Sequence, residues 1–119
     1  MLAGDIVEKT DEMRPNGLSD AAKYGMLDRL ERKIAEELLA HFADAEEHGG
    51  TMDAYTVLLA PDRCEGLYTA YLCAQMDFIN GEIARYNNDM EIFSAEWDAY
   101  AAYLYRTRTH KKSPSFTAL

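Results

Sequence analysis

The chain of 119 residues has few of the features that mark common functional classes. It has two cysteines, Cys64 and Cys73, which form neither a CxxC pair nor a Cys/His array. This excludes the usual zinc motifs and favours free thiols in a reducing compartment. No apolar run approaches the length of a membrane span, and no basic segment precedes a long apolar stretch near Met1. We therefore expect a soluble protein that folds in a cytoplasm.

The sequence also lacks recognisable catalytic motifs. It contains no GxSxG, HExxH, phosphate-binding glycine loop or dinucleotide fingerprint. The three histidines stand apart, without the Glu-x-x-His pairs of a di-iron bundle; they are His41, His48 and His110. The adjacent carboxylates are expected to be solvated rather than tuned for proton transfer; they are Glu36–Glu37 and Glu46–Glu47. We therefore expect no enzymatic activity, no cofactor and no metal ion.

Charge is distributed unevenly along the chain. The net charge is −9, and all 21 acidic residues lie at or before Asp98. The chain through Tyr105 carries −13 (eight basic residues against 21 acidic ones), and the rest carries +4. The four C-terminal basic residues are Arg106, Arg108, Lys111 and Lys112. An acidic body argues against nucleic-acid binding, which requires clustered Lys and Arg.

The hydrophobic pattern predicts helices in the first third of the chain. Residues 2–13 form a short amphipathic helix that ends at Arg14-Pro15, because the residue before proline avoids helical geometry. Ser19 or Asp20 can cap a second helix that runs to about Phe42. Residues 44–52 are polar and glycine-containing, as in a loop, and residues 55–59 form either an edge strand or an extended segment packed on the helices.

Two further helices are predicted. Residues 62–65 have the Asp-x-x-Glu pattern of a capping box. Since apolar residues keep a helical period across Asn80-Gly81, we expect one helix to about Tyr86 rather than a stop at the glycine. Residues 87–89 then form the break, and Asn88 with Glu91 forms a second capping box before a helix with an aromatic seam. Its seam residues are Met90, Phe93, Trp97, Tyr100 and Leu104.

The predicted fold is therefore all-α, a small bundle of about four helices, of which two or three are long, with an extended loop. Residues 1–106 form the helical domain, and residues 107–119 form a flexible basic tail that ends in apolar residues. Eight tyrosines are present. They lie either at protein interfaces, where tyrosine is enriched, or at the edge of the core.

Several segments of the chain resemble a group of small proteins from prophages of Gram-positive bacteria. The resemblance covers nearly the whole chain. It begins at residues 7–9 and 13–16 and continues into Leu27, Leu30 and Ile34. It is strongest at residues 67–74, Asp77 and residues 80–88, where Arg-Tyr-Asn-Asn precedes an aromatic helix. It continues through Phe93, Ala95, Tyr100 and residues 105–107. The chain differs from the family at Ser94, where Asn is usual, and at Trp97 and Tyr100, where smaller aromatics are usual.

These proteins are similar to the head–tail connector (adaptor) proteins of long-tailed bacteriophages. The resemblance implies a helical virion structural protein that forms a homo-oligomeric ring, usually a dodecamer, below the portal protein and joins capsid to tail. It implies the portal and a tail or stopper protein as partners, DNA that passes through without specific binding, and assembly in the cytoplasm of the bacterial host. We expect residues 106–119 to dock on the portal or on the next subunit. Candidate contact residues are Arg106, Arg108, Lys111, Lys112 and Phe116.

Other functions fit the same sequence. A helical phage assembly factor that is absent from the finished particle, or a regulatory interaction protein, would share the acidity and the amphipathic helices. A small helical enzyme or metal binder is disfavoured by the missing motifs. A DNA-binding regulator is least consistent, because the only basic cluster lies in the tail rather than on a helix face.

Overall fold

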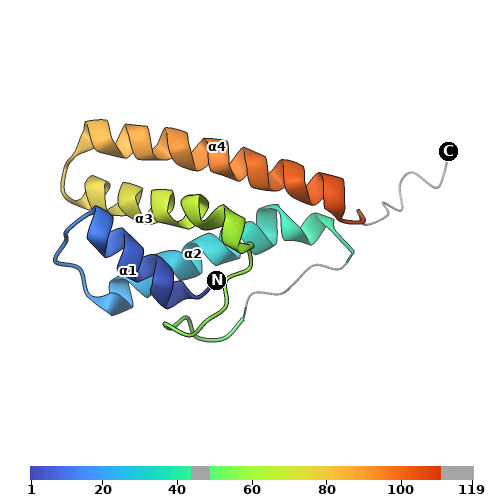
Figure 1. The fold of residues 1–119 in the computed structure, drawn as a ribbon, viewed down its shortest axis with the longest axis horizontal. Helices are drawn as coiled ribbons and strands as arrows, with labels where there is room; N and C mark the ends of the chain where they lie inside the picture. Colours follow the sequence, from blue (N-terminus) through green and yellow to red (C-terminus); the bar gives the residue numbers. More distant parts are fainter. Residues whose placement is uncertain (44–48, 111–119) are drawn as a thin grey trace.

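The computed structural model describes residues 1–43 and 49–110, and these residues form the predicted all-α fold. Four α-helices follow one another as α1 (Ala3–Met13), α2 (Asp20–Glu37), α3 (Glu65–Ile79) and α4 (Ile83–Thr107). Two short 3-10 helices, η1 (Leu39–His41) and η2 (Asp62–Cys64), follow α2 and precede α3. Helix α3 is central: α4 lies along one side of it, and α1 and α2 pack on the other (Figure 1).

The first two helices begin and end largely where the sequence predicts. Helix α1 ends at Met13, and Arg14 is extended, as expected before Pro15. The Ser19 side chain accepts a hydrogen bond from the Ala22 backbone N–H and so caps α2. The prediction that this helix continues to Phe42 is wrong by about one turn. The backbone tightens into η1 after Glu37 while the apolar pattern continues, with Leu38, Leu39 and Phe42 all buried.

The boundary between α3 and α4 differs from the prediction. The chain turns at Asn80-Gly81, where Gly81 has a φ of 73°, and α4 then runs unbroken through residues 87–89. The predicted break and the capping box at Asn88 and Glu91 are therefore wrong, because both lie within α4. Ile79 and Ile83 continue the apolar pattern across the turn, but they belong to two different helices. Both side chains are exposed, so they do not form one buried stripe.

The segment before α3 is extended and lies against the N-terminus. The Ala3 N–H donates to the Thr56 carbonyl, and the Leu58 N–H donates to the Met1 carbonyl. A single bridge between Leu2 and Val57 results, so of the two predicted alternatives the extended segment is correct. The predicted capping box at 62–65 does not form: the residues after Pro61 make η2, and Glu65 instead pairs with Lys9.

The core is built mainly from leucines of α2 and α3, with apolar residues of α1 and α4 on either side. Its largest fully buried side chains include Ile6, Leu27, Leu30, Ile34, Leu67, Leu72, Met76 and Leu104. From the predicted seam of α4, Phe93, Tyr100 and Leu104 are buried, whereas Met90 and Trp97 are half-buried. Trp97 also lies 5.0 Å from the Lys33 amine, measured to the ring centre, which connects α4 to α2.

The far end of α4 is held by aromatic residues. Phe42, after η1, contacts Tyr105 and His110, with ring centres 5.4 Å and 4.9 Å apart. The Ala43 N–H donates to the Thr109 carbonyl. The predicted tail, residues 107–119, therefore starts within α4 at Thr107, and residues 108–110 run alongside residues 42–43.

Candidate interaction surface

The turn between α3 and α4 exposes apolar side chains that a helical hairpin would ordinarily bury. Phe78, Ile79 and Ile83 are 60%, 55% and 56% exposed. The Phe78 ring contacts the half-buried Tyr86, with centres 5.4 Å apart. We call Phe78, Ile79, Glu82 and Ile83 the hairpin-end surface. Clustered apolar groups left in water are typical of sites that bind another molecule.

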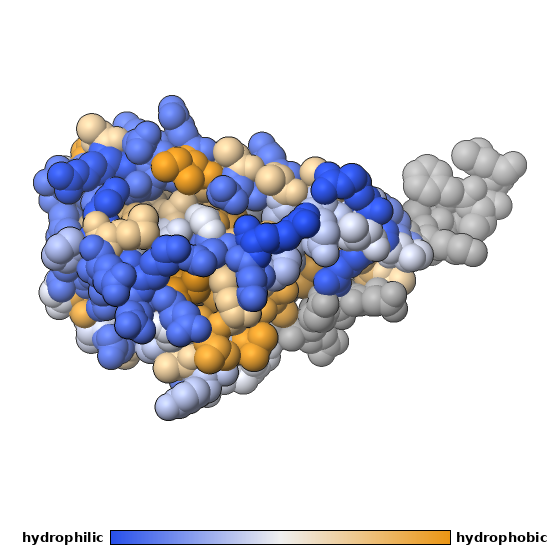
Figure 2. Space-filling model, in the orientation of Figure 1, coloured by the Kyte–Doolittle hydropathy of each residue, from blue (hydrophilic) through white to orange (hydrophobic). Residues whose placement is uncertain are grey.

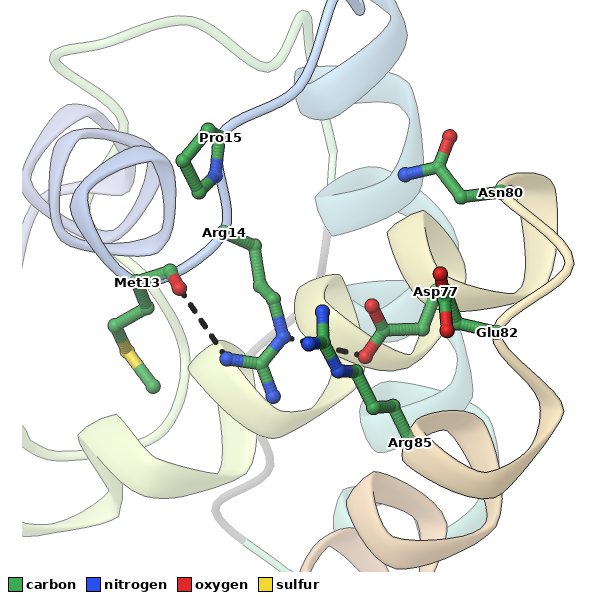
Figure 3. Close-up of a pocket in the computed structure, with 7 residues that line it drawn as sticks. All are labelled: Met13, Arg14, Pro15, Asp77, Asn80, Glu82 and Arg85. Carbon is green, nitrogen blue, oxygen red and sulfur yellow. Dashed lines mark hydrogen bonds and ion pairs between the residues drawn. The ribbon is translucent and has the colours of Figure 1, made fainter.

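A pocket of about 440 Å³ opens beside this surface. Figure 3 shows its lining, which comes from the end of α1 and the two residues after it, from α3 and the turn that follows, and from the first turn of α4: Met13, Arg14, Pro15, Asp77, Asn80, Glu82 and Arg85. Met13 is itself exposed. Four of the nine large apolar side chains that are exposed in the described residues therefore lie at this end of the molecule: Met13, Phe78, Ile79 and Ile83.

Arg14 connects three helices at the pocket. Its Nε donates to Asp77 at 3.3 Å, and an Nη nitrogen donates to Asp89 at 3.4 Å. Asp77 and Asp89 are almost fully buried, whereas Arg14 is partly exposed. Arg14 also donates to the Met13 carbonyl at the end of its own helix. The guanidinium group therefore fixes the end of α1 against both arms of the α3–α4 hairpin.

The two aspartates share the Arg14 guanidinium. Burial, together with the neighbouring Asp77 carboxyl, raises the pKa of Asp89 to about 6, although Arg14 and Arg85 act in the opposite direction. The Oδ2 atom of Asp89 is buried without a hydrogen-bond partner. The cluster therefore holds a carboxyl that changes its charge near neutral pH.

The cysteines show no sign of nucleophilic activation. Both are buried and free, as the sequence predicted. Burial raises the pKa of Cys64 and raises the pKa of Cys73 to about 11. Both therefore remain thiols at neutral pH. Within the described part of the chain, no three His, Cys, Asp or Glu residues are grouped as a metal site would require.

Two of the predicted contact residues, Arg106 and Arg108, lie at the opposite end of α4. Arg106 is exposed in its last turn, and Arg108 is half-buried just after it, where its N–H donates to the Leu104 carbonyl. Lys111, Lys112 and Phe116 lie outside the described residues. The sequence prediction missed the hairpin-end surface and the Arg14 cluster. No motif or spacing in the sequence indicates either of them, because Arg14, Asp77 and Asp89 meet only in the folded chain.

No helix in the described residues combines the length and apolar character needed to cross a membrane. Over α4 the face shown in Figure 2 is mostly hydrophilic, and hydrophobic side chains gather lower down, where the N-terminus and the segment before α3 lie.

Comparisons with protein-family models, curated proteins and solved structures give no match.

Proposed function

We propose that this chain is a head–tail connector protein of a long-tailed bacteriophage. In this role, copies of the chain form a ring below the portal protein, join the capsid to a tail or stopper protein, and leave a passage for DNA. The observation that carries the proposal is the meeting of residues 13–16 with residues 77–89. Residues 13–16, Asp77 and residues 80–88 carry much of the resemblance to connector proteins; Arg14 joins them across more than sixty positions by its bonds to Asp77 and to Asp89, which follows residue 88.

The exposed surfaces support an assembly role. A ring subunit needs two different surfaces that bind each other and close the ring. The hairpin-end surface lies at one end of α4, and the basic C-terminal residues begin at the other. Helix α4 buries only Asp89, Phe93, Tyr100 and Leu104, so most of its outer side is available for contacts.

The charge distribution supports passage of DNA without binding. The chain through Tyr105 carries −13, and acidic groups repel phosphates electrostatically. Basic residues within this part are frequently paired: Lys23 with Asp11, Arg32 with Asp28, and Lys33 with Glu37. A ring built from such subunits would present few free cations to a passing duplex.

A non-virion assembly factor, or a regulatory interaction protein, would share the acidity and the helical fold. The two roles differ in what happens when the gene is deleted from the phage and the lysate is examined by electron microscopy. A connector predicts filled heads and complete tails that remain separate, and joining is restored when purified protein is added to them. Loss of heads or of tails themselves would contradict the proposal and favour an assembly factor.

A further inference from the structure

The hairpin-end surface has the chemistry of a protein-binding site. Its exposed residues are three large apolar groups, Phe78, Ile79 and Ile83, with the exposed acid Glu82 among them. No described residue of the same chain covers them. A matching segment would carry basic residues near apolar ones.

The chain carries such a segment at its C-terminus. Residues 111–119 begin with Lys111 and Lys112, contain Phe116 and end with Leu119, and they contain no acidic residue. Two cations would face a body whose net charge is −13, and two large apolar side chains follow within seven residues. The segment therefore matches the hairpin-end surface mainly in hydrophobicity, and its lysines can pair with Glu82, the one acid of that surface.

Residues 111–119 are too short to bind the hairpin-end surface of their own chain. Helix α4 has 25 residues, and at about 1.5 Å per residue it separates its two ends by roughly 37 Å. His110 is held at the far end by its contacts with Phe42 and Tyr105. Phe116 is six positions further on, so even a fully extended chain carries it only about 22 Å. The two lysines lie closer still to His110.

We infer that residues 111–119 of one copy bind the hairpin-end surface of the next copy. The contact is heterologous, since it joins two different surfaces, and repetition of it gives a ring or an open filament. The pairing itself rests only on the residues above; closure into a ring below a portal rests on the proposed function. Of the two docking partners expected from the sequence, the inference selects the next subunit.

Crosslinking of the full-length protein tests this pairing. The variant Ile83→Cys/Phe116→Cys keeps the native thiols, which are buried, and is oxidised mildly at millimolar protein concentration. We expect a ladder of linked dimers, trimers and larger species in denaturing electrophoresis. Mixing the two single variants should give dimers only. A control variant, Tyr55→Cys/Phe116→Cys, places the first thiol at a site that is 83% exposed on another part of the surface, and it should give little ladder.

Additional changes separate specific pairing from random collision. Glu82→Lys, added to the crosslinking variant, should lower the yield of linked dimer several-fold. In the crosslinking variant that retains Glu82, a higher salt concentration should also lower this yield. A species linked only within one chain, equal ladders from the Ile83 and Tyr55 variants, or no ladder would overturn the inference. If it fails while the protein still joins heads to tails, the connector role stands; if the ladder forms but joining proceeds without the protein, the connector role fails alone.

Discussion

The hydroxyl of Tyr68 donates a hydrogen bond of 2.5 Å to the buried carboxylate of Glu31. The same carboxylate accepts from the Leu59 backbone N–H at 2.7 Å, and the Tyr68 oxygen accepts from the Ala60 N–H at 3.0 Å. Burial and the Glu31 carboxylate raise the pKa of Tyr68, so the hydroxyl remains a donor. This network attaches the extended segment before α3 to both α2 and α3.

Replacing Tyr68 by Phe should therefore destabilise the fold. The variant Tyr68→Phe leaves the Ala60 N–H unsatisfied and removes a donor from a buried charge, which costs about 1–3 kcal/mol. Urea unfolding followed by circular dichroism measures the effect. Tyr55→Phe removes the same hydroxyl at an exposed site and serves as the control. If both variants unfold at the urea concentration of the wild type, the network does not stabilise the fold.

Replacement by alanine should have opposite effects on stability at two glycines of the described residues. Gly81→Ala forces a side chain into a positive φ of 73° and should destabilise the protein by about 1 kcal/mol. Gly25 lies within α2, and a Cβ there meets nothing within 4 Å, so Gly25→Ala should stabilise by roughly 0.5–1 kcal/mol. Thermal and urea unfolding of both variants check the signs. A stabilising Gly81→Ala would contradict the position of the turn.

The Asp89 carboxyl should make stability depend on pH. Its pKa rises from 3.8 to about 6 in the folded protein, so between these values the folded state holds a proton that the unfolded chain has released. The contribution of this group to stability is therefore largest at low pH and falls as pH rises through about 6. In Asp89→Asn this loss is absent. Between pH ~4 and pH ~7, the free energy of unfolding of the variant should therefore rise relative to that of the wild type by up to about 3 kcal/mol.

Urea unfolding across that pH range measures the gain. Asn88→Ala, an exposed and uncharged neighbour on α4, should run parallel to the wild type. Parallel curves for Asp89→Asn and the wild type would mean that Asp89 does not take up the proton.

A charge placed on the hairpin-end surface should impair assembly without unfolding the protein. Ile83→Asp replaces an exposed side chain in the first turn of α4, where an acid interacts favourably with the helix dipole. Its unfolding midpoint should remain close to that of the wild type, whereas joining of heads to tails should be lost. Val57→Asp, at another exposed apolar position, is the matched control. Full joining activity of Ile83→Asp would remove the hairpin-end surface from the assembly mechanism.

The effect of truncating the C-terminus should depend on whether the residues that contact Phe42 are kept. Arg106 lies within α4, and residues 108–110 run beside residues 42–43. We therefore expect truncation after His110 to leave the helical circular dichroism spectrum and the unfolding midpoint unchanged while abolishing joining. A longer truncation, from Arg106, should also lower stability. Normal joining by the protein that ends at His110 would refute a role for Lys111, Lys112 and Phe116.

The sequence predicts the elements of this fold better than it predicts their ends. Ser19 was identifiable because a polar cap hydrogen-bonds locally, and Arg14-Pro15 because proline restricts its neighbour. The turn at Gly81 was missed because Ile79 and Ile83 are four residues apart, the spacing of a buried helical stripe, although both are exposed. A pattern of apolar residues carries no information about which of them the fold leaves exposed.

The candidate site depends on contacts that no local pattern contains. Arg14 reaches Asp77 and Asp89 only because α1 ends beside the α3–α4 turn. The charge asymmetry of the chain is a property of the sequence, and it indicates Arg106 and the basic residues after it as contact residues. The complementary surface was not visible, because it forms only when α3 and α4 fold back on each other.

Quantitative mass spectrometry of purified phage particles tests the central claim most directly. If the chain is a connector subunit, it should be present in finished virions in a fixed ratio to the portal protein, near one to one for rings of equal size, and absent from particles of a deletion strain. Its absence from wild-type virions would contradict the connector assignment and leave a transient assembly factor in its place.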